Sequence, residues 1–148
     1  MISVVQRVST ASVSVEHPSY FAEIQSGLCV LLGVEEGDGE EHAMWMARKL
    51  ANLRIFQDKE GKMNRSVKDI CGEILLISQF TLAGDCNAGN RPSFIEAAKP
   101  DVAEPLINLV GAMLQHDHGI PISTGIFGAT MKVSIVNEGP VTLVIKRD

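Results

Sequence analysis

The sequence predicts an α+β fold, in which two or three helices pack against a curved, mainly antiparallel β-sheet. Two observations carry this prediction: strand patterns outnumber helix patterns, and a helix separates only some of the successive strands. The length predicts the number of domains, because 148 residues and 16.0 kDa suit one compact domain. We therefore expect a single domain that spans residues 1–148.

The first half of the chain alternates between strand and helix periodicity. Residues 2–15 are predicted to form two half-buried strands joined near Ser9-Thr10, because apolar and polar residues alternate on either side of that point. Gly27 opens the apolar run LCVLLGV, which is typical of a strand covered on both faces. Ala43, Ala47 and Leu50 share one helical face, which predicts a helix over residues 40–52.

The middle of the chain contains the strongest strand pattern, GEILLISQFTL at residues 72–82. Before it, LRIF at 53–56 indicates a short strand, and the charged segment 57–69 indicates a hairpin or loop. After it, Ser93 and Glu96 have the spacing of a capping box and predict a short helix.

The last third is predicted to contain one long helix and two strands. The capping-box spacing recurs at Asp101 and Glu104, and Pro105 is compatible with the helix only in its first turn. Gly119 and Pro121 end this helix. Strands MKVSIV and VTLVIK follow, on either side of a turn, NEGPVT.

Charge and composition exclude several classes of protein. A net charge of -5 argues against wrapping a long phosphate backbone, although capture of one strand end remains compatible with it. No apolar run is long enough to span a membrane, and the N-terminus lacks the pattern of a signal peptide. Three cysteines without a CxxC pair argue against a disulfide framework or a zinc site, which favours the cytoplasm.

The usual catalytic motifs are missing from the sequence. It contains no GxSxG, no GxxxxGK[ST], no GxGxxG after a strand and no HExxH. His116 and His118 are better explained as a solvated helix end than as a metal chelate, and Cys29 as a core thiol. We therefore expect neither a metal ion nor a cofactor.

Two segments remain to be explained, SQFTL at 78–82 and NEGPVT at 137–142. Polar groups at the end of a buried strand serve a pocket or a turn, and the residues alone do not separate these two uses. For Gly139-Pro140 the residues alone favour an ordinary trans turn, because only about 5–6% of X–Pro bonds are cis.

Together, these two segments resemble the signature motifs of the D-aminoacyl-tRNA deacylases. The resemblance covers the whole chain, through MISVVQRVSTASV, LLGV, RIFQDKEGKMNRSV, RPSF and TGIFGATMKVSIVNEGPVT. It implies a β-barrel-like α+β fold and a cytoplasmic homodimer that hydrolyses the ester of D-aminoacyl-tRNA or glycyl-tRNA. The partners that it implies are the 3′ end of the tRNA and a second subunit, with no DNA and no membrane.

The resemblance also implies roles for individual residues. A cis Gly139-Pro140 element enters the partner's site and excludes L side chains, Met131 supports the pocket, and the residues that line it are Ser78, Gln79, Phe80 and Thr81. The backbone N–H groups of Phe80 and Thr81 polarise the ester, and the RNA 2′-hydroxyl helps to activate water. The sequence departs from many family members at Thr130, where they have Asp, and at Ala22, where they have Gly.

Two other hypotheses remain open. One is a non-catalytic protein that sequesters aminoacyl-tRNA or a D-amino acid derivative. The other is an esterase that uses Thr81 as nucleophile with an unrecognised base, whereas we interpret Thr81 as a positioning group. A related branch that accepts certain L-aminoacyl-tRNAs differs in both motifs, which are intact here.

Overall fold

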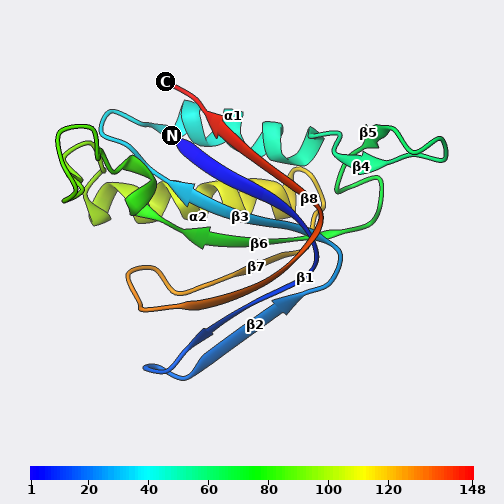
Figure 1. Ribbon diagram of the computed structural model, residues 1–148, viewed down its shortest axis with the longest axis horizontal. Helices are drawn as coiled ribbons and strands as arrows, with labels where there is room; N and C mark the ends of the chain where they lie inside the picture. The colour runs from blue at the N-terminus through cyan, green and yellow to red at the C-terminus, as the bar shows by residue number, and fades with distance from the viewer.

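The computed structural model describes residues 1–148, and its elements are arranged as a curved sheet with two helices on one side (Figure 1). The strands are β1 (Ile2–Val15), β2 (Tyr20–Ile24), β3 (Gly27–Gly33), β4 (Phe56–Gln57), β5 (Met63–Arg65), β6 (Glu73–Ser78), β7 (Ile122–Thr124) and β8 (Lys132–Lys146). The helices are α1 (Glu40–Asn52), the short 3₁₀ helix η1 (Phe80–Ala83) and α2 (Pro100–His116).

The main sheet has the order β2-β1-β3-β6-β7, and β8 pairs with β1. β1 is antiparallel to β2, β3 and β8, whereas β6 is parallel to β3 and β7. The end strands β2 and β7 come together, where Tyr20 Oη donates a hydrogen bond of 2.7 Å to the carbonyl of Thr124. The sheet is therefore nearly closed into a barrel, and the predicted α+β class with a curved, mainly antiparallel sheet is confirmed.

Both faces of the central strands are buried. Leu28 and Val30 belong to the larger core beneath the helices, whereas Cys29 between them belongs to a smaller core on the opposite face. The smaller core has seven residues: Val8, Ala11, Val13, Ile24, Cys29, Leu75 and Ile77. The prediction that the apolar run beginning at Gly27 forms a strand covered on both faces is thus confirmed.

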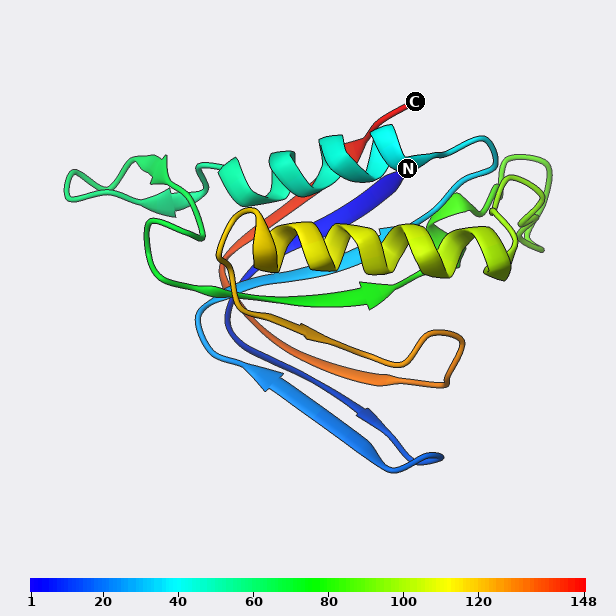
Figure 2. The same cartoon turned by 180° about the vertical axis from the view of Figure 1, so that it is seen from behind.

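Helices α1 and α2 cover the larger core side by side, as the view from behind shows (Figure 2). The predicted bounds of α1 are confirmed, and the side chains that it buries include Ala43, Ala47 and Leu50. Met46 is fully buried, whereas Met44 is 53% exposed. Neither helix is long and apolar enough to cross a membrane.

The predicted break at Ser9-Thr10 is wrong, because β1 is one continuous strand. The neighbouring strand β8 pairs with β1 on both sides of Ser9, and Thr10 lies opposite Val136. This pairing keeps the backbone extended where a break was predicted. NEGPVT is likewise not a turn between two strands but part of β8. Opposite this segment, the β1–β8 ladder has two register shifts, between Gln6 and Val8 and between Val8 and Thr10.

The strand predicted for residues 72–82 ends earlier than expected, at Ser78. The pairing of β3 with β6 ends with a hydrogen bond of 2.8 Å from the Gln79 N–H to the carbonyl of Leu32, because β3 itself ends at Gly33. Without a partner strand the chain turns into η1. The short strand predicted at LRIF begins only at Phe56, and the charged segment after it forms the β4–β5 hairpin.

The short helix predicted at Ser93 and Glu96 is not formed. Ser93 instead pairs with Asp85 through two backbone hydrogen bonds of 2.8 and 2.9 Å. The long helix is confirmed, but it begins at Pro100 after Lys99, so Asp101 is not its cap. A proline at the first helical position has its φ already set for a helix and lacks only an N–H that would be unpaired anyway.

Pro105 lies in the second turn of α2 rather than in its first. Its ring lies on the exposed face of the helix, and so does Asp101, whose carbonyl loses the usual N–H partner. Water can satisfy that carbonyl, which explains why the helix continues through the proline.

Candidate functional site

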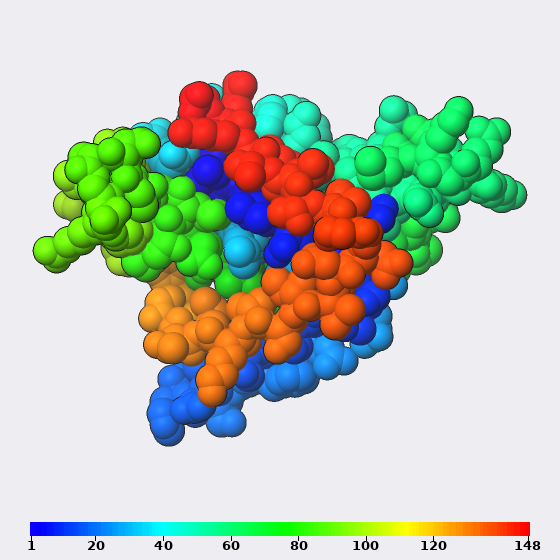
Figure 3. All heavy atoms as spheres, in the orientation of Figure 1, coloured from blue at the N-terminus to red at the C-terminus, as the bar shows by residue number.

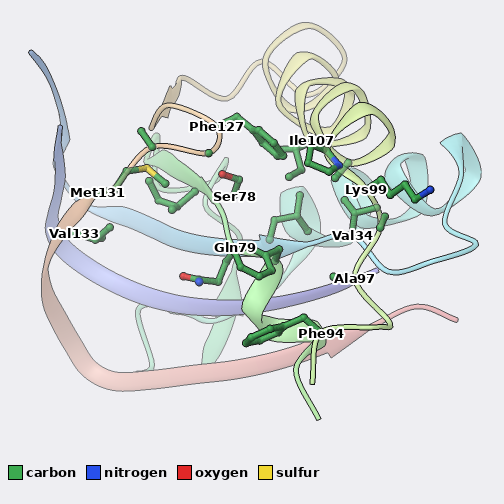
Figure 4. Close-up of a pocket in the computed structure, with 18 residues that line it drawn as sticks. Val34, Ser78, Gln79, Phe94, Ala97, Lys99, Ile107, Phe127, Met131 and Val133 are labelled. Atoms are coloured by element: carbon green, nitrogen blue, oxygen red, sulfur yellow. The ribbon is translucent and has the colours of Figure 1, made fainter. Parts of the chain in front are cut away.

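The largest apolar pocket lies where β6 ends. It has a volume of about 580 Å³ and is lined by 18 residues from β3, the β6–η1 junction, the start of α2 and the loop before β8 (Figure 4). They are Leu32, Val34, Ile77, Ser78, Gln79, Phe80, Phe94, Ala97, Ala98, Lys99, Pro100, Ala103, Ile107, Phe127, Gly128, Ala129, Met131 and Val133. Ser78, Gln79, Phe80 and Met131, all singled out in the sequence, are therefore brought together.

The predicted pocket residue Thr81 lies beside the pocket rather than in its lining. Its hydroxyl accepts a hydrogen bond from Nε2 of Gln79, which links the two sides of the β6–η1 junction. The N–H groups of Phe80 and Thr81 start η1 and have no acceptor within that helix. Two adjacent backbone donors thus lie at the β6–η1 junction, next to a fixed amide side chain, and one of them belongs to Phe80, which lines the pocket.

Glycines create the close contacts that shape this pocket. A Cβ on Gly125 would overlap Sδ of Met131, so a larger residue there would require the Met131 side chain to move. A Cβ on Gly33 would lie 2.8 Å from the carbonyl oxygen of Gln79, directly at the end of β6. Glycines at these two positions therefore allow Met131 and the Gln79 backbone to lie close to the neighbouring chain.

Two aromatic rings close one side of the pocket. Phe80 and Phe94 meet edge to face, with ring centroids 5.2 Å apart and an interplanar angle of 69°. Phe94 comes from the RPSF segment. The sequence analysis assigned this segment no role in the site and named it only as part of the family resemblance. A Cβ on Gly84 would lie 2.8 Å from the Phe94 ring, so this glycine admits the aromatic pair.

The lining contains no histidine, cysteine or carboxylate, and Lys99 is its single charged side chain. No group of three or more His, Cys, Asp or Glu residues in the protein is arranged to hold a metal ion. Burial raises the pKa of the Cys29 thiol to about 11, in agreement with its predicted place in the core. The chemistry that this pocket can supply is orientation, exclusion of water and hydrogen bonding from backbone donors and from the polar side chains of Ser78, Gln79 and Lys99.

Gly139-Pro140 does not lie in this pocket. The bond is cis, and both residues are exposed on β8, the strand that crosses the outer surface of the molecule in Figure 3. Gly139 has φ of 126°, in the region that favours glycine. The element therefore cannot contribute to the pocket of its own chain.

Arg7 holds this element in place, and the sequence interpretation missed it. Nε of Arg7 donates to the carbonyl of Glu138 at 2.9 Å, and Nη1 donates to the carbonyl of Ile55 at 2.6 Å. The residue is only 8% exposed. Strand alternation could have found it, because Arg7 shares the inward side of β1 with Ser3 and Val5 and a buried arginine needs partners.

Comparison with known proteins gives the class to which this fold and pocket belong. The chain matches the family described as D-Tyr-tRNA(Tyr) deacylase over residues 4–146. It is 51% identical over 146 residues to the D-aminoacyl-tRNA deacylase of Chlorobaculum parvum, covering 99% of this chain and 97% of that one. The protein belongs to the D-Tyr-tRNA(Tyr) deacylase family, a family of hydrolases.

Two solved structures share the fold. The c-Myc DNA Unwinding Element Binding Protein is 41% identical, with a TM-score of 0.91 and coverage of 100% of this chain and 99% of that one. A structure described as a probable eukaryotic D-amino acid tRNA deacylase has a TM-score of 0.83 at 16% identity, covering 97% of both chains. The second likeness concerns the fold alone.

Proposed function

We propose that the protein is a D-aminoacyl-tRNA deacylase, which hydrolyses the ester between a D-amino acid, or glycine, and the terminal adenosine of tRNA. The observation that carries this proposal is the pocket, whose lining includes Ser78, Gln79, Phe80 and Met131 and which lies where η1 begins. Family membership supports the same activity. Such an enzyme acts in cytoplasmic translation quality control, because it removes amino acids that the ribosome should not receive.

In the proposed mechanism the protein supplies no nucleophilic side chain. The N–H groups of Phe80 and Thr81 donate to the ester carbonyl oxygen and stabilise the negative charge that develops on it. Water attacks the carbonyl carbon, the 2′-hydroxyl of the RNA helps to activate that water, and the C–O bond to the 3′-oxygen breaks. An aminoacyl ester is labile, so orientation and oxyanion stabilisation supply the required acceleration.

Selectivity is proposed to come from a second subunit. Gly139-Pro140 lies outside its own pocket and on the surface, which is the arrangement expected if it enters the pocket of a partner. Its backbone carbonyls would then occupy the space of an L side chain. Val136 and Val144 on the same strand are 56% and 69% exposed, which favours burial of this face in a homodimer.

A non-catalytic nucleic-acid binder is the alternative, because the c-Myc DNA Unwinding Element Binding Protein, which shares this fold, is named for binding to a DNA element. The net charge of -5 and a pocket sized for one small group favour the deacylase. A binder holds its ligand without turnover. Multiple turnovers per subunit therefore separate the two functions.

The decisive experiment is deacylation of matched D- and L-tyrosyl-tRNA by the purified protein. We expect multiple turnovers on the D substrate, at a rate on the order of 100-fold or more above the L substrate. Equal rates for the two enantiomers would overturn the proposed selectivity. Glycyl-tRNA in the same assay tests the second proposed substrate.

The Gly139→Ala variant tests which element provides this selectivity. A Cβ there would lie 2.9 Å from Nη2 of Arg7 at a φ unsuited to alanine, so the element must shift and the D-to-L rate ratio should fall. Gly61→Ala is the matched control, because Gly61 also has positive φ but lies in the β4–β5 hairpin with nothing within 4 Å. An unchanged ratio in Gly139→Ala contradicts the filter.

A further inference from the structure

A groove with several cations lies on α1, away from the pocket. It has a volume of about 530 Å³ and is lined by Trp45, Arg48, Lys49, Asn52, Leu53 and Arg54, with no acidic residue. Arg147, from the C-terminal end of the chain, adds a fourth cation beside Trp45. Four of the 13 Lys and Arg residues of an acidic protein are therefore concentrated around one groove.

These four cations, which we call the groove cations (Arg48, Lys49, Arg54 and Arg147), have no carboxylate partner, whereas three lysines elsewhere, Lys62, Lys132 and Lys146, do. Lys132 pairs with Glu16 at 3.1 Å, and Lys62 pairs with Glu60 at 3.7 Å. None of the groove cations forms an ion pair. Their side chains are exposed and free to bind an anion.

Trp45 organises two of the groove cations. Nζ of Lys49 lies 5.1 Å from the ring centroid, and the guanidinium carbon of Arg147 lies 5.7 Å from it. With these cations over the ring, Trp45 does not offer a bare platform for stacking a nucleobase. The groove therefore presents positively charged donors, which suit phosphate groups better than bases.

The groove and the pocket lie on different elements. α1, whose middle and C-terminal end line the groove, runs toward β4, whereas β6 runs the other way and ends at the pocket (Figure 1). The two share no lining residue. A ligand that contacts both must be long and must carry negative charge along its length.

We propose that this groove binds the phosphate backbone of the tRNA, outside the pocket that receives its aminoacylated end. The inference rests on the proposed function, because a pocket of about 580 Å³ takes only the end of the substrate and leaves the rest of the RNA outside. It also explains how a protein with a net charge of -5 attracts a polyanion: the groove cations provide a local positive surface.

The test is binding of an uncharged tRNA transcript at several salt concentrations, with Lys49→Gln, Arg54→Gln and the double variant. We expect several-fold weaker binding for each single change, and a slope of log affinity against log salt that becomes shallower by about 0.9 per cation removed. Lys62→Gln is the matched control, since it makes the same change of charge at a lysine already paired with Glu60. It should bind like the wild type.

Hydrolysis assays distinguish a loss of RNA contacts from a loss of stability, because only the former changes KM for tRNA without changing kcat. With D-tyrosyl-tRNA the groove variants should raise KM and leave kcat unchanged, because the lost contact is equal in ground and transition states. With D-tyrosyl-adenosine, which lacks phosphate, they should match the wild type. A thermal unfolding curve for each variant shows that the fold is intact.

The outcomes separate this inference from the proposed function. If wild type hydrolyses D-tyrosyl-tRNA but the groove variants bind RNA as it does, the groove proposal is overturned and an acidic protein surface becomes the better occupant. The same holds if Lys62→Gln weakens binding as much as Lys49→Gln. If wild type does not hydrolyse D-tyrosyl-tRNA, the proposed function fails, while the RNA-binding comparison still decides for or against the groove.

Discussion

Thr81 is the residue at which the two enzymatic mechanisms differ. Its hydroxyl accepts a hydrogen bond from Gln79, and the pocket beside it contains no histidine or carboxylate that could act as its base. A hydroxyl without a base is a weak nucleophile. The environment therefore favours a positioning role, in which Thr81 orders the backbone donors of the β6–η1 junction.

Replacement of Thr81 by alanine tests this role. If Thr81 orders the donors, Thr81→Ala should lower kcat on D-tyrosyl-tRNA by about 10- to 100-fold, because small misplacement of an oxyanion donor has effects of this size. A nucleophile would lose about 10⁶-fold. Single-turnover kinetics measures the difference, and Thr81→Ser, which keeps the hydroxyl, should stay close to wild type.

At the scale of elements, the β1–β8 ladder connects the core to the proposed filter. The register shifts between Gln6 and Thr10 interrupt the regular pairing where Arg7 extends across to Glu138. A second bond from Arg7 to Ile55 ties the same place to the segment before β4. One buried side chain thus fixes an exposed backbone element against two parts of the fold.

Loss of this side chain should affect both stability and selectivity. Arg7→Met leaves two carbonyls without their donors, which costs about 1–3 kcal/mol and lowers Tm by roughly 5 °C. Because Gly139 then loses its support, the D-to-L rate ratio should fall as well. Thermal denaturation and the paired deacylation assay measure the two effects. A lower Tm with an unchanged ratio would assign Arg7 a structural role only.

At the scale of the whole molecule, an ion cluster joins the start of β1, the loop before α1 and the end of β8. Glu35 accepts from the Met1 ammonium at 3.0 Å and pairs with Lys146 at 3.1 Å. Partial burial acts to raise the pKa of Glu35, but the ammonium and Lys146 outweigh it and hold that pKa below its usual value. The cluster therefore favours the ionised carboxylate in the folded state.

This depressed pKa gives a signed pH dependence. The contribution of Glu35 to stability is present above the ordinary pKa that this carboxyl has in the unfolded chain, and it is lost as the pH falls through the lower folded value. Glu35→Gln should therefore destabilise the protein near neutral pH, and the difference from wild type should shrink below about pH 4. Urea unfolding at both pH values measures it. Glu36→Gln, at a residue without an ion pair, is the control, and a difference independent of pH contradicts the prediction.

Local patterns were sufficient to predict the fold class, the helix α1, the doubly covered strand β3 and the presence of the long helix α2. These features depend on residues within a few positions of one another, and burial imposes the same period wherever the element packs. The failures were of another kind. The capping-box spacing at Ser93 and Glu96 was overridden by pairing of Ser93 with Asp85, a contact that no local pattern encodes.

Two motifs some sixty residues apart were enough to predict the family, and the chain order alone supplies the residue types of the site. How those residues are used depends on the folded chain. The tertiary structure showed that β1 and β8 are continuous because they pair with each other, that Ser78 and Met131 share one pocket, and that Gly139-Pro140 lies outside it. The physical reason is that strand pairing and pocket closure join residues far apart in the chain, whereas periodicity reports only which face of each element is buried.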